Sequence, residues 1–219
     1  MKTSDPTTTP NFDALARPYR WLEYLTFGPY LQRTRTCFLS ELETCRRALV
    51  LGDGDGRFTA ALLRANPSIH VHAIDASPAM LRALQKSAGP HADRLTTEAA
   101  DLRQWSPRAG THYDLVATHF FLDCLTTPEI AVLAARLSPA LAPQARWVVS
   151  DFAIPATKFG ALVAAPLVAA LYRAFSILTH LRVRQLPNHR AALESSGWAM
   201  ESEKKHLGGL LLSQLWHRR

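Results

Sequence analysis

Short apolar runs alternate with amphipathic helical runs through the middle of the chain. Strand-like runs occupy residues 47–51, 69–74, 113–118 and 146–149, and helical runs occupy residues 57–65, 78–86 and 131–141. Repeated strand–helix units of this kind predict an α/β fold, in which a mostly parallel sheet carries helices on both faces.

Two of the predicted helices begin with a capping signal. Ser77 precedes Pro78, and Thr127 precedes Pro128. A Ser or Thr hydroxyl accepts a hydrogen bond from an unpaired N–H of the first turn, and proline has the backbone geometry of the first helical position. We therefore expect helices to begin at these two points.

The flanks of this alternating core have a different pattern. Residues 12–42 are amphipathic and rich in aromatic residues, which predicts two helices broken near Gly28-Pro29. Residues 154–186 are apolar and predict a helical insertion after the strand at 146–149. Its apolar stretch is interrupted by Pro166 and is too short to span a bilayer. A helix at 189–196 and two short strands, near 199–205 and 210–215, are expected to close the chain.

Composition narrows the class of protein. The chain has 219 residues, of which 47% are hydrophobic and 20% are charged, so a packed core is expected and wholesale disorder is excluded. Three cysteines without C-x-x-C spacing argue against a disulfide scaffold or a zinc ribbon and fit a cytoplasmic protein. Residues 1–10 are polar, without the apolar segment of a signal peptide, and are expected to form a disordered tail.

The charge balance leaves several partners open. Twenty-five Lys and Arg residues against 18 Asp and Glu residues give a formal charge of +7. Such a surplus permits contact with an acidic substrate, a lipid headgroup or a nucleic acid, or it only makes the surface basic. Arg182, Arg184 and Arg190 are candidates for holding an anionic group of a substrate, and a solvated basic face is the alternative. The scattered His180, His189 and His206 predict no metal site.

The most informative segment joins the first predicted strand to its helix. It reads Leu51-Gly52-Asp53-Gly54-Asp55-Gly56. Glycines at alternate positions let the backbone turn tightly and approach a ligand closely. Asp75 ends the next predicted strand, 19 residues after Gly56, where a carboxylate can accept hydrogen bonds from ribose hydroxyls.

The spacing and charge of this loop select among nucleotide-like ligands. The dinucleotide pattern G-x-G-x-x-G/A fails in both registers, and no Gly-Lys-Ser/Thr of a P-loop follows. Asp53 and Asp55 would repel a pyrophosphate and suit a cationic ligand. S-adenosylmethionine (SAM) carries an ammonium, a sulfonium and a ribose but no phosphate, so it fits both features.

At this point the sequence resembles the class I SAM-dependent methyltransferases. Four segments match motifs of that superfamily in order: 51–56, 74–80, 100–102 and 113–118. The resemblance implies a Rossmann-like, seven-stranded, mostly parallel sheet with an N-terminal helical lid and a helical insertion after the fifth strand. It also implies the cofactor-binding residues Tyr19, Gly52, Asp53, Gly54, Gly56, Asp75, Ala76, Met80, Asp101, Leu102 and Thr118.

One position departs from the family pattern. An acidic residue usually stands near the start of the first motif, where it helps to hold the methionine end of SAM, and here that position is Val50. We hypothesise that Asp53 takes over this role.

The flanks resemble, more loosely, the ubiquinone/menaquinone-type C-methyltransferases. The similar segments are Phe12–Ala16 with Tyr19, Phe27-Gly28, and Val149–Phe152 with Pro155. The expected division is a tail at 1–10, a helical lid at 11–45 that includes Tyr19, and a methyltransferase domain at 46–219 with its insertion at about 154–186.

Candidate catalytic residues follow the fourth predicted motif. His119 and Asp123 leave the strand at its C-terminal end, where ligands bind in open α/β sheets. Either side chain could act as a general base or orient the acceptor. The alternatives are that His119 only packs in the interior and that Asp123 is an ordinary surface or helix-start carboxylate.

These features favour transfer of a methyl group to a small, hydrophobic acceptor of phenolic or quinone-like character. The apolar insertion suggests this acceptor, or a peripheral contact with a membrane. Two other functions stay open: an RNA methyltransferase, motivated by the basic charge, and a non-catalytic protein with the SAM-binding fold. Because the charges are dispersed and no RNA-binding motif is attached, a nucleic-acid partner is disfavoured.

Overall fold

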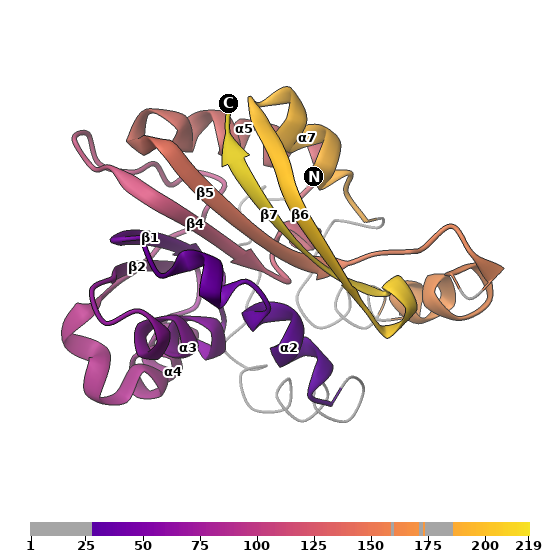
Figure 1. The fold of residues 1–219 in the computed structure, drawn as a ribbon, viewed down its shortest axis with the longest axis horizontal. Coiled ribbons are helices and arrows are strands. Elements are labelled where there is room, and N and C mark those ends of the chain that lie inside the picture. The colour runs from indigo at the N-terminus through magenta and orange to yellow at the C-terminus, as the bar shows by residue number, and fades with distance from the viewer. Residues whose placement is uncertain (1–27, 159, 171–172, 174–185) are drawn as a thin grey trace, which may run out of the picture.

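A seven-stranded sheet forms the centre of the computed structural model, which describes residues 28–158, 160–170, 173 and 186–219 (Figure 1). The strands are β1 (Arg47–Leu51), β2 (His70–Asp75), β3 (Leu95–Ala99), β4 (Tyr113–His119), β5 (Leu141–Phe152), β6 (Trp198–His206) and β7 (Leu211–Arg218). Their order is β3-β2-β1-β4-β5-β7-β6. Strand β7 runs antiparallel to both neighbours, and the pairs from β3 to β5 are parallel. The predicted α/β class is thereby confirmed.

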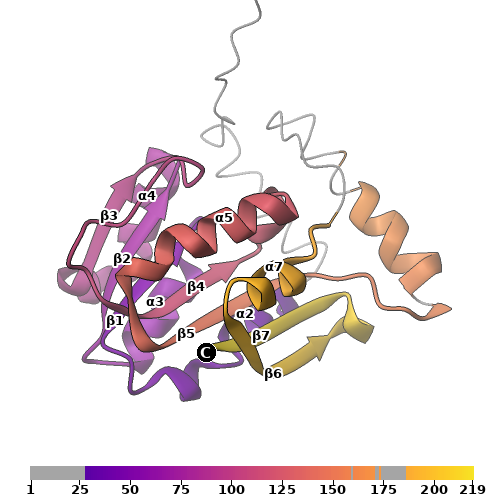
Figure 2. The same cartoon turned by 90° about the horizontal axis from the view of Figure 1, so that it is seen from above.

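Five α-helices are described in full. They are α2 (Tyr30–Thr36), α3 (Arg57–Ala65), α4 (Pro78–Ala88), α5 (Thr127–Leu137) and α7 (His189–Ser195). Short 3₁₀ turns lie at Leu39–Leu42, Gly89–Arg94, Leu122–Cys124, Ser138–Ala140 and Leu207–Gly209, and a π-helical turn lies at Gly160–Ala164. Strand β3 ends the sheet on one side and the β6–β7 hairpin ends it on the other (Figure 2).

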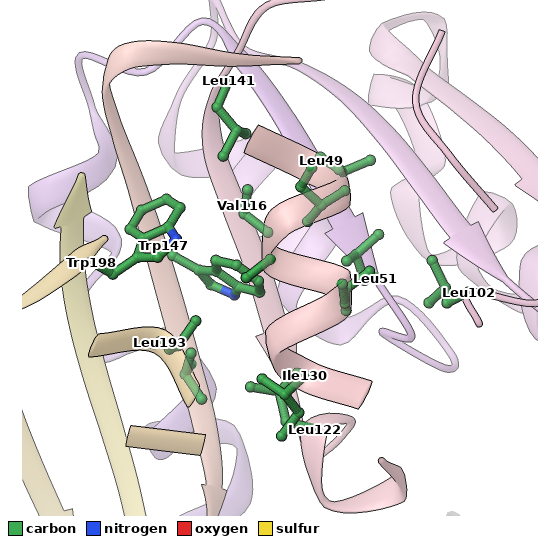
Figure 3. Packing of buried hydrophobic residues seen from close by; sticks show 14 of the residues in the cluster. Leu49, Leu51, Leu102, Val116, Leu122, Ile130, Leu141, Trp147, Leu193 and Trp198 are labelled. Carbon is green, nitrogen blue, oxygen red and sulfur yellow. The ribbon is translucent and has the colours of Figure 1, made fainter. Parts of the chain in front are cut away.

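Alternation along the strands divides the core between the two faces of the sheet. In β1, Leu49 and Leu51 pack with Trp147 and with Ile130 of α5 (Figure 3), whereas Val50 packs with residues of α3 and α4. Successive side chains of a strand point to opposite faces, so a strand that is buried on both faces reads as a continuous apolar run.

A third, smaller cluster lies apart from these two cores. It joins α2 to the described part of the insertion and to the start of β7 through Leu31, Ala164, Val168, Leu210 and Leu211. The aromatic rings of Phe120 and Phe152, which follow β4 and end β5, pack against it. Apolar side chains therefore gather at the edge of the sheet where the parallel strands end.

The start and the end of α5 correct the sequence-based prediction. The N-cap is Thr126, not Thr127, and its hydroxyl forms a capping box with Glu129. The helix ends at Leu137, and Leu141 begins β5 instead of ending the helix. Proline lacks the N–H that a helix interior needs, so the chain leaves the helix through the 3₁₀ turn that contains Pro139.

Helix α2 begins directly after the Gly28-Pro29 pair at which the break was predicted, where Gly28 has a φ of 53° and Pro29 is the N-cap. The first predicted helix of this segment, with Tyr19, lies outside the described residues, as do the predicted tail and the middle of the insertion. Residues 160–170 of the insertion are helical, as expected. Within the described parts of the chain, no helix has the length and apolar character needed to cross a membrane.

Candidate functional site

The glycine loop turns sharply between β1 and α3. Gly52, Gly54 and Gly56 have φ values of 65°, 56° and 80°, in the left-handed region that L side chains rarely adopt. The N–H of Gly52 donates to the carbonyl of Ile74 over 2.9 Å, which joins the loop to the end of β2. The loop and the end of β2 thus form one continuous edge.

The three glycines differ in their surroundings. A Cβ on Gly52 would lie 2.3 Å from the ring of Phe121, and a Cβ on Gly56 would lie 2.7 Å from Leu84. A Cβ on Gly54 would meet no atom within 4 Å. Close packing therefore accounts for the outer two glycines, and Gly54 is the one that faces open space.

Asp53 points beneath the loop into the protein. It is buried, and its Oδ2 accepts a hydrogen bond from the backbone N–H of Thr59 over 2.8 Å, which caps the first turn of α3. Its Oδ1 has no hydrogen-bond partner within the described residues. Burial raises the pKa of Asp53 to about 6, and the hydrogen bond from Thr59 and the charge of Arg35 oppose that rise.

The charges of the loop are partly compensated. The carboxylate of Asp55 lies 3.1 Å from Nε of Arg57, and Arg35 acts on Asp53. Val50, at the position where the family has an acid, is 1% exposed and packs in the core between the sheet and α3. Its side chain therefore cannot contact a ligand above the loop.

Asp75 ends β2 beside the loop. Its Oδ1 accepts the N–H of Ser77 over 2.8 Å, and its carbonyl accepts the N–H of Ala100 over 3.1 Å. The second of these bonds brings Asp101 to the same edge. Ala76 is exposed, whereas Met80 is buried in α4 and its N–H donates to the Ser77 hydroxyl.

Asp101 and Leu102 face different environments. Asp101 is half-buried, and its Oδ1 accepts the N–H of Arg103 over 2.9 Å. Leu102 is 6% exposed and belongs to the core cluster on the α5 face of the sheet. Only the carboxylate of this pair combines partial exposure with chemistry that suits a polar ligand.

The last residues of β4 point to opposite faces. Thr118 is fully buried, and its hydroxyl accepts a hydrogen bond from Nε1 of Trp147 over 3.0 Å. His119 is 3% exposed, its ring centroid lies 4.1 Å from that of Phe58, and neither ring nitrogen has a partner within the described residues. Burial and the charge of Arg35 lower the pKa of His119 well below its usual value, so the ring is neutral at pH 7.

Asp123 lies in a different environment, beside a second carboxylate. Oδ2 of Asp151, at the end of β5, accepts the backbone N–H of Asp123 over 3.1 Å, and Oδ1 accepts the N–H of Phe152 over 2.9 Å. Burial raises the pKa of Asp123 to about 6. Burial and the charge of Asp123 raise the pKa of Asp151 well above its ordinary value. The structure thus pairs Asp123 with Asp151, and within the described residues the ring nitrogens of His119 make no hydrogen bond to Asp123.

Three residues at this edge were not predicted from the sequence. Asp151 is 1% exposed. The sequence feature that could have identified it is an acidic residue near the end of an otherwise apolar strand. Arg35 of α2 lies 4.9 Å from the ring of Phe120 and acts electrostatically on both Asp53 and His119. Phe120 has a φ of 54°, a strained value that only the folded environment reveals.

The other candidate residues contribute less. Tyr19, Arg182 and Arg184 lie outside the described residues. Nε of Arg190 lies 3.1 Å from the carboxylate of Glu194, one turn along α7, and both side chains are exposed. This pair supports the alternative that Arg190 belongs to a solvated basic face.

The residues at the loop edge fit SAM. The open space at Gly54 allows a ligand to approach the backbone, and Asp75 and Asp101 place two carboxylates at the same edge for hydroxyl and amino groups. The backbone of the loop and these two acids would hold the cofactor, which supplies an activated methyl group when bound.

Comparison with known proteins gives a consistent result. A family model described as a methyltransferase domain matches residues 49–147. Trans-aconitate 2-methyltransferase from Mycobacterium tuberculosis is 32% identical over 122 residues, which cover 55% of this chain and 43% of that protein. The match therefore spans less than half the length of that relative.

Solved structures resemble nearly the whole chain. The mitomycin 7-O-methyltransferase MmcR is 20% identical with a TM-score of 0.70, covering 97% of this chain and 61% of that one. The SAM-dependent methyltransferase SibL is 22% identical with a TM-score of 0.68, covering 98% and 63%. An O-methyltransferase family 2 protein from Planctomyces limnophilus, in complex with apigenin, is 18% identical with a TM-score of 0.67, covering 91% and 61%.

At these identities the structural likeness establishes the fold alone, and the family match is confined to residues 49–147. SAM is the cofactor that this family implies. Residues 49–147 thus match the methyltransferase-domain family, and the chain has the fold of the solved SAM-dependent methyltransferases that it resembles.

Proposed function

We propose that this protein transfers the methyl group of SAM to a small, hydrophobic acceptor of phenolic or quinone-like character. The observation that carries the proposal is the apolar wall beside the glycine loop. Phe120 and Phe152 lie with their ring centroids 5.2 Å apart where β4 and β5 end, and they pack against the cluster that contains Val168 of the insertion. Apolar walls with few polar groups are typical of sites for small organic ligands.

Methyl transfer needs mainly positioning, because the cofactor is already activated. Holding the acceptor in line at near-attack distance can supply about 7–11 kcal/mol of the barrier. In this proposal, Phe120 and Phe152 hold the acceptor and exclude water, and the glycine loop with Asp75 and Asp101 holds the cofactor. The Asp123–Asp151 pair is the candidate proton acceptor for an acceptor hydroxyl, since one raised pKa near 6 lies close to neutral pH.

The neighbouring enzymes support a small-molecule acceptor. MmcR is a mitomycin 7-O-methyltransferase, and the Planctomyces limnophilus protein was solved in complex with apigenin. We retain the division into a helical lid at 11–45 and a catalytic domain at 46–219 as part of this proposal, because the family match lies within the second range.

A second candidate is methylation of a carboxylate on a polar acid. The similarity of this chain to trans-aconitate 2-methyltransferase and its formal charge of +7 favour this second candidate. It would need cationic side chains at the acceptor position, and Arg35 is the guanidinium that lies next to Phe120. The two candidates thus differ in the polarity of the acceptor.

The test is turnover of SAM to S-adenosylhomocysteine with a panel of phenols, quinols and polycarboxylic acids. We expect turnover with aromatic acceptors, and Phe152→Ala should raise KM more than it lowers kcat because it removes apolar contact area. Turnover with polycarboxylates alone would favour the second candidate. SAM binding without turnover across the panel would favour the non-catalytic alternative.

Cofactor binding is tested separately by calorimetry. Asp75→Ala should weaken SAM binding by roughly tenfold or more, the usual effect of losing a hydrogen bond to a charged group. Asp93→Ala removes an exposed carboxylate from the 3₁₀ turn at Gly89–Arg94 and serves as the control. Equal affinities of the two variants would contradict the assignment of Asp75.

A further inference from the structure

A pocket of about 590 Å³ lies at the edge of the sheet opposite the glycine loop. It is lined by Arg47, Ala48, His70, Val71, His72, Thr96, Thr97, Glu98, Arg108, Thr111 and Tyr113. These residues come from the first positions of β1, β2 and β4, from β3, and from the loop before β4. Gly52 follows Arg47 by five strand positions, which is about 16 Å at the rise of an extended chain. The pocket is therefore separate from the proposed cofactor site.

Three side chains of the lining, Glu98, His72 and Tyr113, form a hydrogen-bonded chain, which Trp105 extends behind the pocket wall. Oε1 of Glu98 accepts from Nε1 of Trp105 over 2.9 Å, and Oε2 lies 3.2 Å from Nε2 of His72. Nδ1 of His72 lies 2.7 Å from the hydroxyl of Tyr113. Since an ionised carboxylate only accepts, Nε2–H of His72 is the donor to Glu98, and Nδ1 accepts from the Tyr113 hydroxyl. Both oxygens of the one carboxylate in the pocket lining are thus already hydrogen-bonded.

Two arginines face the same space without partners. Within the described residues, the guanidinium groups of Arg47 and Arg108 make no hydrogen bond and no ion pair. Both arginines line the pocket together with Tyr113, and their charges oppose the rise that burial causes in the pKa of the Tyr113 hydroxyl. Other arginines of the sheet and its connections are paired, such as Arg57 with Asp55 and Arg103 with Glu129. The unpaired charge in this pocket is therefore positive.

We propose that this pocket is a second binding site, which takes a small anionic metabolite through a carboxylate or phosphate group held between Arg47 and Arg108. Planar guanidinium groups bind such oxyanions through paired, charge-assisted hydrogen bonds. The volume falls within the range of small-molecule sites, and the hydroxyls of Thr96 and Thr111 add polar groups to its lining. The Glu98–His72–Tyr113 chain fixes the wall against which the anion rests.

The experiment is a calorimetric titration of the full chain with citrate, as the carboxylate probe, and with inorganic phosphate. The double variant Arg47→Gln/Arg108→Gln should reduce the affinity for the more tightly bound of the two anions by roughly tenfold or more, the usual effect of losing charge-assisted hydrogen bonds. The double variant Arg33→Gln/Arg82→Gln makes the same change of charge on α2 and α4, outside the pocket, and should leave the affinity within about twofold.

Three outcomes would overturn the proposal: no saturable binding of either anion, equal weakening in both double variants, or binding to vesicles that contain anionic lipid without binding to the soluble probes. SAM affinity is measured on the same samples and should be unchanged by Arg47→Gln/Arg108→Gln. A failure here is thus distinguishable from a failure of the proposed methyltransferase function, which is read from SAM binding and turnover.

Discussion

Gly52 and Gly54 share a left-handed backbone but differ in what surrounds them. In Gly52→Ala, the new Cβ would lie 2.3 Å from Phe121, so overpacking of about 1–3 kcal/mol adds to the cost of the backbone conformation. In Gly54→Ala, only the backbone cost of about 1–2 kcal/mol remains. Chemical denaturation should therefore show Gly52→Ala to be the less stable variant.

The two glycine variants also distinguish an effect on packing from an effect on ligand binding. Gly54→Ala should remain folded but lose SAM affinity in calorimetry, because its Cβ enters the space that a ligand is expected to occupy. Undiminished affinity of Gly54→Ala would show that the cofactor does not approach the loop at this glycine.

The Asp123–Asp151 pair makes stability depend on pH. Because the pKa of Asp123 is raised from 3.8 to about 6 in the folded state, the folded protein retains a proton that the unfolded chain releases. The contribution of this group to stability is present below about pH 4 and is lost as the pH rises towards 6, and the raised pKa of Asp151 extends the loss to higher pH. Asp123→Asn removes one charge and should flatten this decline.

The measurement is the free energy of unfolding between pH 4 and 8 for the wild type and two variants. Asp93→Asn changes an exposed carboxylate and should reproduce the wild-type profile. A wild-type stability that rises over this range would contradict the burial of the carboxyl groups of Asp123, Asp151 and Asp53 as the dominant effect.

At single residues, the sequence predicts which functional groups lie at the site better than it predicts the direction in which their side chains point. The glycine loop, Asp75 and Asp101 could be placed at one edge of the sheet, because their position relative to a strand end is set by the chain itself. The inward direction of Asp53 could not be predicted, because it depends on capping of α3 through Thr59. Asp151 was missed as a site residue because its partner, Asp123, comes from a distant part of the sequence, the 3₁₀ turn that follows β4.

Among the elements, α5 offers a direct test of capping. Thr126→Ala removes the hydroxyl that accepts the N–H of Glu129 and should reduce stability by about 1 kcal/mol in chemical denaturation. Thr126→Ser keeps the hydroxyl and should stay close to the wild type. If the two variants lose equal stability, the threonine acts through its methyl group and not through the capping box.

Some element boundaries depend on pairing between strands, which the local hydrophobic pattern of the sequence does not reveal. The run at 47–51 and the helix at 57–65 were predicted to the residue, since one is bounded by charge and glycine and the other by the loop and Asn66. Strand β3, which reads Leu-Thr-Thr-Glu-Ala and is half-exposed, was not predicted. It forms because β2 offers an unpaired edge to it. In the same way, β5 begins at Leu141 because it pairs with Tyr113 there.

In the molecule as a whole, the apolar cluster at the end of the parallel strands is smaller than the two cores and separate from them. It holds α2 and the described part of the insertion to β7. Free energies of local opening vary across a structure, and segments with few buried contacts open first. The elements around the proposed acceptor wall should therefore open without unfolding the sheet.

Two leucine-to-alanine variants test this separation. Leu31 of α2 is 2% exposed in the small cluster, and Leu62 of α3 is fully buried in the core. Each loses the same side-chain atoms, for which about 2–5 kcal/mol is usual in a core. Hydrogen exchange should show Leu31→Ala to deprotect 160–170 and 207–211 while the sheet remains protected, whereas Leu62→Ala should lower protection of the sheet. A uniform loss of protection in both variants would mean that the acceptor wall and the sheet unfold as one unit, so that the wall could not open for an acceptor independently of the cofactor site.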